Sequence, residues 1–122
     1  MAETNMAADT EKFRAVKPEA PITTIGALME AQGFFTGDGA MRCLARSAQA
    51  LSNGVRAGHA IPPLVAFARR TNVLNATMDE RLDDLISDHL SFLRHLADAL
   101  SLEYDELDAR AATYYAEDVS GE

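Results

Sequence analysis

The chain has 122 residues, enough for one domain with a modest core, and its single cysteine, Cys43, excludes an internal disulfide framework. Its formal net charge is −8, and the excess of carboxylates lies entirely after residue 60. No stretch has the composition of a signal peptide or of a transmembrane helix, so we expect a cytoplasmic protein that does not bind membranes.

The chain divides into three predicted parts. Residues 1–22 are polar and contain two prolines, which predicts a flexible N-terminal arm. Residues 23–118 are predicted to form a helical domain, and residues 119–122 a short C-terminal tail. No strand pair and no internal repeat is visible, so the predicted fold is all-α, a single-domain bundle of about five helices.

The first helices are marked by their boundary residues. A short helix is predicted from Thr23 or Thr24 to Gly33. A second is predicted from Asp38, a good N-cap residue, to the stop signal Asn53-Gly54. A third begins at Pro62 or Pro63, because the missing N–H of proline is harmless in a first turn. Its expected buried side chains are Leu64, Val65 and Ala68.

One long amphipathic helix, from about residue 77 to residue 100, is the strongest pattern in the chain. Thr77 and Glu80 have the spacing of a capping box. Steps of four and three residues place an apolar seam on one side of this helix. The seam contains Leu82, Ile86, His89, Leu93, Leu96 and Leu100. A last helix is predicted from about Leu102 to Ala116, with Ser101 as its cap.

His89 within this seam has two interpretations. In the first, its ring packs in the core and forms a hydrogen bond with a neighbouring helix. In the second, Leu82, Ile86, His89, Leu93 and Leu96 form a self-association seam of a homodimer, in which the polar residue sets the register.

The opposite side of the long helix is acidic. Asp79, Glu80, Asp83 and Asp84 crowd its start, where the helix dipole favours negative charge. The dipole accounts for these four, but Asp88 and Asp98 lie further along, and the like-charged pairs Glu80–Asp84 and Asp84–Asp88 are unfavourable at a spacing of four residues. We therefore predict a partner-binding acidic face made of Glu80, Asp84, Asp88 and Asp98.

The sequence offers little for catalysis or for metal and cofactor binding. His89 and His95 are six residues apart on the helix, so their side chains point roughly 120° away from each other and cannot coordinate the same metal ion. Cys43 is expected on or near a buried helix face, without any nucleophile motif around it. The glycine-rich segment 33–39 lacks the lysine and the preceding strand of a phosphate-binding loop. We predict no catalytic residue, no metal and no cofactor.

Residues 96–107 resemble the helix–turn–helix of many bacterial repressors. Ser101 stands where a glycine is common, and the following helix carries four carboxylates and Arg110 as its one basic residue, which opposes contact with phosphates. If DNA is bound, the expected contacts are Arg42, Arg46, Arg56, Arg69 and Arg70.

The function expected from these observations is that of a non-enzymatic, acidic helical adaptor or regulatory protein that binds another protein. The partner is expected to have a basic surface, such as one that otherwise binds nucleic acid. The alanine- and arginine-rich composition suggests a bacterial or phage genome. The alternative is a helix–turn–helix-like DNA-binding transcriptional regulator.

Overall fold

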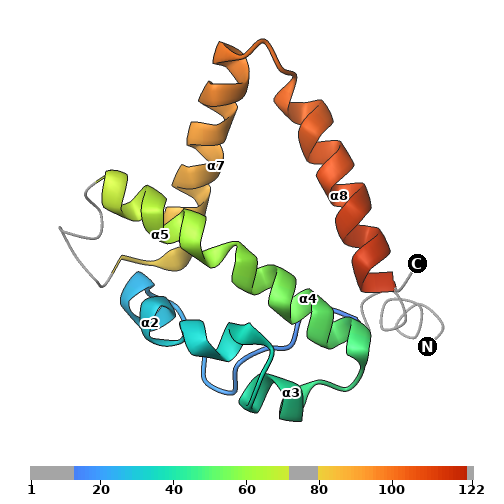
Figure 1. Cartoon of the computed structure of the whole chain (residues 1–122). Coiled ribbons are helices and arrows are strands. Elements are labelled where there is room, and N and C mark those ends of the chain that lie inside the picture. Colours follow the sequence, from blue (N-terminus) through green and yellow to red (C-terminus); the bar gives the residue numbers. More distant parts are fainter. Residues whose placement is uncertain (1–12, 72–79, 121–122) are drawn as a thin grey trace, which may run out of the picture.

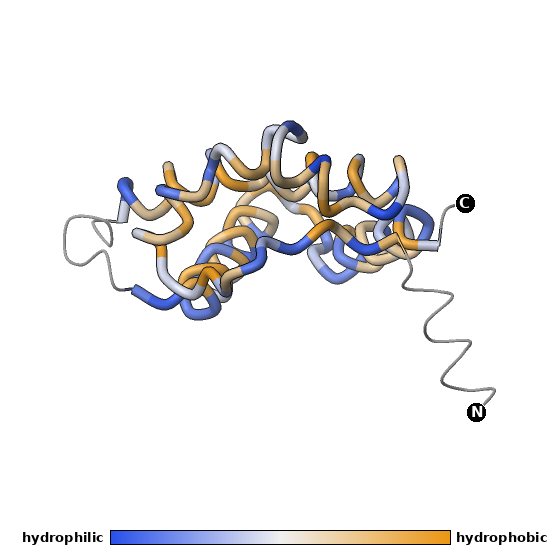
Figure 2. Tube along the Cα trace, turned by 90° about the horizontal axis from the view of Figure 1, so that it is seen from below, coloured by the Kyte–Doolittle hydropathy of each residue, from blue (hydrophilic) through white to orange (hydrophobic). Residues whose placement is uncertain are grey.

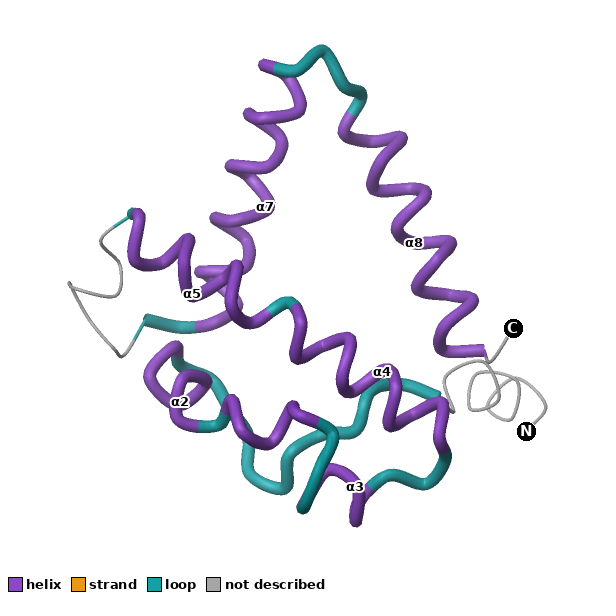
Figure 3. Tube along the Cα trace, viewed as in Figure 1, coloured by secondary structure: helices purple, strands orange, loops and turns teal. Residues whose placement is uncertain are grey.

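The computed structural model describes residues 13–71 and 80–120, and the regular elements in these ranges are all helices (Figure 3). In chain order they are α2 (Ile25–Glu30), the 3₁₀ helix η1 (Gln32–Thr36), α3 (Ala40–Leu44), α4 (Ala48–His59), α5 (Ile61–Arg70), α7 (Leu82–Ala99) and α8 (Tyr104–Ser120). The predicted all-α bundle of about five helices is confirmed.

Helices α4 and α5 form a nearly continuous rod across the molecule (Figure 1). One residue, Ala60, separates them, and Pro62 and Pro63 lie in the first turn of α5, as predicted. Helices α2 and α3 lie on one side of this rod. Helices α7 and α8 rise from the other side, at its two ends, and meet at their shared turn. Hydrophobic residues recur at intervals along the helices rather than in unbroken runs (Figure 2).

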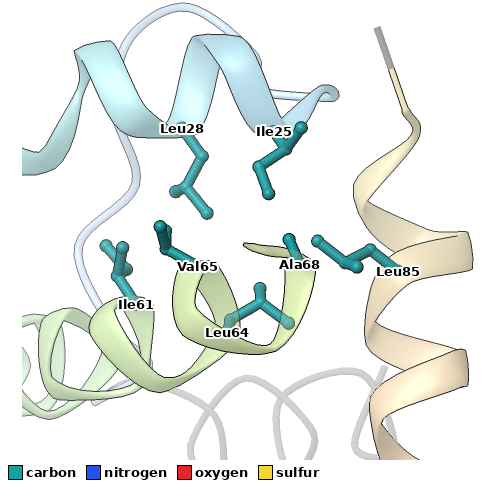
Figure 4. Close-up of a cluster of buried hydrophobic side chains, with 7 residues drawn as sticks. All are labelled: Ile25, Leu28, Ile61, Leu64, Val65, Ala68 and Leu85. Carbon is teal, nitrogen blue, oxygen red and sulfur yellow. The ribbon is translucent and has the colours of Figure 1, made fainter. Parts of the chain in front are cut away.

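The main hydrophobic core lies where α2, α5 and α7 meet. Figure 4 shows its seven buried side chains, which come from these three helices. They are Ile25, Leu28, Ile61, Leu64, Val65, Ala68 and Leu85. Helix α2 begins after Thr24, whose hydroxyl accepts a hydrogen bond from the Ala27 N–H, so the predicted N-terminus of this helix is confirmed.

The prediction of one helix between Asp38 and Asn53 is wrong. Helix α3 ends at Leu44, and α4 starts after Ser47, whose hydroxyl accepts a hydrogen bond from the Ala50 N–H. Asp38 makes no cap, since Gly39 holds the N-cap position with a positive φ of 54°. Asn53 and Gly54 instead lie buried in the middle of α4. Met41 packs so close to Gly54 that a Cβ atom there would lie 2.9 Å from the Met41 sulfur.

Gly58 lets the 3₁₀ helix approach α4 closely. A Cβ atom at this position would lie 2.7 Å from the carbonyl oxygen of Phe35 and 2.8 Å from its Cβ. Both of these atoms belong to or adjoin the backbone, so they cannot turn aside as the end of a flexible side chain can.

The variant Gly58→Ala should therefore lose stability although alanine is the better helix former. Overpacking costs about 1–3 kcal/mol, and the gain in helix propensity offsets roughly 1 kcal/mol of it. Urea unfolding measures the difference. The control is Gly33→Ala, where no atom lies within 4 Å of the added Cβ. A Gly58→Ala variant as stable as the wild type would show that the two elements separate at no cost.

The long helix α7 starts later than predicted. Arg81 is extended at the N-cap position, and the Glu80 carbonyl before it accepts a hydrogen bond from the Ile25 N–H, at 3.1 Å. The Leu82 N–H donates to the Thr23 carbonyl, so the starts of α2 and α7 are tied together by a short antiparallel bridge. The predicted capping box is thus not formed by Glu80, and Thr77 lies outside the described residues.

An exposed ion pair flanks the first turn of α7. The Arg81 guanidinium donates two hydrogen bonds to the Asp83 carboxylate, and this lowers the pKa of the Asp83 carboxyl below its usual value. A lowered pKa means that the pair stabilises the fold at neutral pH and that the contribution disappears as the pH falls through the pKa. Because both side chains are largely exposed, the effect is small.

The C-terminal end of α8 is anchored by Asn53, whose side chain is buried. The Asn53 amide donates hydrogen bonds to the carbonyls of Asp118, at 3.0 Å, and of Phe13. Gln49 also donates to the Asp118 carbonyl, and the Phe13 N–H donates to the Val119 carbonyl. The last carbonyls of a helix lack partners within it, so these contacts satisfy the end of α8 and hold it against α4.

Helix α8 is longer than predicted, because it runs through Ser120 instead of ending near Ala116. Val119, assigned to the tail from the sequence, is buried. The predicted arm, residues 1–22, is described only from residue 13 onward. Within that part Phe13 bonds to α4 and α8, and Ile22 packs against the main core.

Candidate protein-binding surface

Helix α7 carries two adjoining apolar stripes rather than one seam. The first stripe faces the rest of the fold. Leu82 and Leu85 pack against the main core, and the rings of His89 and Phe92 contact Phe67 of α5, with centroid distances of 4.6 and 5.0 Å. This stripe binds α7 to the end of the α4–α5 rod.

The second stripe faces α8 and is largely exposed. It repeats at steps of four and three residues and contains Ile86, Leu90, Leu93, Ala97 and Leu100. Helix α8 has a matching stripe at the same kind of spacing, which contains Tyr104, Leu107, Ala111 and Tyr114. The two helices diverge from their shared turn (Figure 1). The stripes therefore approach each other only near the turn, where Ala97 is buried.

Between the two stripes lies an open apolar groove of about 390 Å³. Its lining is Leu90, Leu93, Leu96, Ala97, Leu100, Leu102, Tyr104, Leu107, Asp108 and Ala111. Ile86 and Tyr114 lie two turns beyond Leu93 and Leu107, on the same helix faces as these residues, so they extend the groove at its open end. We call this groove, together with Ile86 and Tyr114, the α7–α8 apolar surface. Single exposed leucines are ordinary, but a continuous surface of this kind is typical of an interaction site.

The turn that joins α7 and α8 follows a standard helix ending. The Leu102 N–H donates to the Ala97 carbonyl, at 2.8 Å, and the Ser101 N–H donates to the Asp98 carbonyl, at 3.2 Å. This is the Schellman pattern, which requires a left-handed residue after the C-cap. Ser101 takes that conformation, with φ of 61°, and is thus not the helix cap that the sequence suggested.

The variant Ser101→Gly should stabilise the fold by about 1 kcal/mol. Glycine removes the contact between Cβ and the backbone that makes a left-handed residue costly, and the greater freedom of glycine in the unfolded chain offsets part of the gain. Thermal unfolding checks the sign. The control Ser91→Gly, on the exposed side of α7, should instead destabilise the fold, as glycine does within a helix. A destabilised Ser101→Gly variant would contradict this account of the turn.

The predicted self-association seam is divided between the two stripes. Leu82 packs against the main core and His89 against Phe67, within the same chain. Ile86, Leu93 and Leu96 are instead 45%, 39% and 52% exposed. The half-buried ring of His89 packs on Phe67, but its Nδ1 atom is buried without a hydrogen-bond partner among the described residues. The expected hydrogen bond from this atom to a neighbouring helix is therefore not formed within that part of the chain.

The predicted acidic face is separate from the apolar surface. Asp84, Asp88 and Asp98 are exposed on α7, within about 80° of one another around the helix and opposite Leu93. We call these three the acidic stripe. Glu80 precedes the helix and is half-buried, so it does not continue the stripe. Near the turn, Asp98 lines a small polar hollow with Arg94, which pairs with Asp105 at 3.1 Å and lies 4.2 Å from the Tyr104 ring centroid.

The five arginines predicted as nucleic-acid contacts do not form one cluster. Arg42 and Arg46 lie in and after α3, near the start of α4, whereas Arg69 and Arg70 end α5 at the other end of the rod (Figure 1). The Arg56 guanidinium donates a hydrogen bond to the Asn53 side-chain oxygen, at 2.7 Å, and its Nε atom lies 4.0 Å from the Asp118 carboxylate.

The remaining features bear on chemistry and membranes. Cys43 is exposed, so its expected place on or near a buried face is wrong. Within residues 13–71 and 80–120, no three histidine, cysteine or carboxylate side chains lie close enough together to hold a metal ion. None of the described helices is long and apolar enough to cross a membrane.

No family model, curated protein or solved structure matches the chain.

Proposed function

We propose that this protein is a non-enzymatic adaptor or regulatory protein that acts by binding other proteins, in the cytoplasm of a bacterium or as a phage product. The α7–α8 apolar surface is the observation that carries this proposal. Monomeric proteins rarely expose a continuous apolar surface of this extent unless it binds a partner.

The acidic stripe supports a second contact, with a partner of basic character. Asp84, Asp88 and Asp98 are exposed, and none of them forms an ion pair within the described residues. Their repulsion is a cost that a positively charged partner would relieve. A surface that otherwise binds nucleic acid has the required charge.

Capture from the native host tests this contact. The full chain, tagged at its C-terminus, is compared with the triple variant Asp84→Asn, Asp88→Asn, Asp98→Asn. The control neutralises three exposed carboxylates of the first half of the chain, Glu19, Glu30 and Asp38. We expect the captured protein to be lost with the stripe variant, retained with the control, and displaced by added duplex DNA. Capture that is unchanged in the stripe variant would contradict the basic partner.

A helix–turn–helix regulator is the second candidate, favoured by the left-handed residue in the four-residue turn between α7 and α8. The start of α8 opposes it, because Asp105, Glu106 and Asp108 would approach the phosphates. A gel shift with mixed genomic fragments at low salt, where phosphate contacts are strongest, is expected to show no complex. A shifted band lost in the double variant Arg69→Ala, Arg70→Ala would favour this candidate instead.

A further inference from the structure

We infer that the partner covering the α7–α8 apolar surface is a second copy of this chain, and that the two helix pairs join as a four-helix bundle. This inference rests on the proposed function, because it names the occupant of the surface that carries that proposal. Three features of α7 and α8 identify the occupant.

The first feature is the spacing of the exposed stripes. Both stripes repeat at steps of four and three residues, which is the period of helices that pack along their length in coiled coils and bundles. Within one chain the two stripes separate away from the turn (Figure 1), and Ile86, Leu90 and Tyr114 remain 45%, 45% and 59% exposed. A second pair of helices with the same period and similar length, 18 and 17 residues, supplies the missing neighbours.

The second feature is the exposed area. Seven large side chains of the surface are between 39% and 59% exposed: Ile86, Leu90, Leu93, Leu96, Leu100, Leu102 and Tyr114. With roughly 200 Å² for a fully accessible large side chain, they expose on the order of 700 Å². A stable interface buries about 600–1,000 Å² on each partner, so the surface has the size of one side of a symmetric dimer.

The third feature is the distribution of charge. Asp108 is the one charged residue in the lining of the groove, so the groove offers little to select a charged peptide. The acidic stripe lies on the opposite side of α7 from Leu93, so it faces outward when the apolar surfaces meet. The net charge of −8 on each chain therefore does not prevent the association, and the dimer presents two acidic stripes.

Light scattering coupled to size exclusion, on the full chain between about 1 and 100 µM, tests the inference. We expect twice the 13.2 kDa mass of one chain, and a melting temperature that rises with protein concentration. Leu93→Glu should weaken the dimer at least a hundredfold. Leu100→Gln, which adds no charge at an exposed helix end, should weaken it at least tenfold while the far-UV circular dichroism spectrum stays helical.

The matched control is Leu44→Glu, which changes an exposed leucine on α3, outside the surface. It should leave the dimer intact. A wild-type mass of 13.2 kDa at 100 µM, or a dimer unaffected by both surface variants, would overturn the inference. If the wild-type chain is a monomer and Leu100→Gln abolishes capture of a host protein, the inference fails while the proposed binding function stands. If the chain is a dimer but no protein is captured, the inference stands and the adaptor function fails.

Discussion

Replacement of Leu85 by alanine is expected to destabilise the protein by about 3 kcal/mol, within the 2–5 kcal/mol that buried leucine-to-alanine changes usually cost. Leu85 is fully buried and points toward Ala68 in the main core (Figure 4). It is the one large side chain of α7 that is fully buried among the described residues. The cavity left by alanine would loosen the attachment of α7 to α5.

Urea unfolding at one fixed protein concentration measures this loss, since association adds to apparent stability. The control Leu44→Ala removes the same atoms from a leucine that is 37% exposed, and should cost about 1 kcal/mol or less. Equal losses for the two variants would mean that the junction of α2, α5 and α7 is not the principal core.

Replacement of Asn53 by alanine is expected to cost about 1–3 kcal/mol and to release the end of α8. The variant removes both hydrogen bonds that the buried Asn53 amide donates, to the carbonyls of Asp118 and Phe13, whereas Gln49 contributes only one, to Asp118. Hydrogen exchange should show the loss locally, as faster exchange of the amides in the last turns of α8.

Gln49→Ala provides the comparison for this effect. The Asp118 carbonyl would keep its bond from Asn53 in that variant, so the last turns of α8 should exchange only slightly faster than in the wild type. Unchanged exchange in Asn53→Ala would contradict the role of Asn53 as the anchor of α8.

Local sequence signals were sufficient where one residue controls the structure by itself. Thr24 begins α2 through its own hydroxyl, and Pro62 and Pro63 fit the first turn of α5, where the missing N–H of proline is harmless. The same kind of signal failed at Asn53-Gly54, which is a common helix stop. Tertiary contacts outweigh its propensity, because Met41 fills the space beside Gly54 and α8 binds the amide of Asn53.

The candidate surface was predictable in part. The period of α7 identified Ile86, Leu93 and Leu96 as apolar positions on one side of a helix. It could not separate the stripe around Leu85, which packs on α5, from the stripe around Leu90, which remains open. The stripe of α8 was harder to find, since tyrosine and alanine make up most of it.

By itself, the sequence determined the all-α class, the apolar period of α7 and the acidic stripe on its opposite side, because helix geometry alone places residues three and four apart on one face. Only the tertiary structure decided which part of that apolar face is used within the chain. The reason is that α8 is held at both ends, by the Ser101 turn at one and by Asn53 at the other, so it spans the molecule instead of packing along α7. A periodic pattern specifies a face, whereas the anchoring of distant residues determines what covers it.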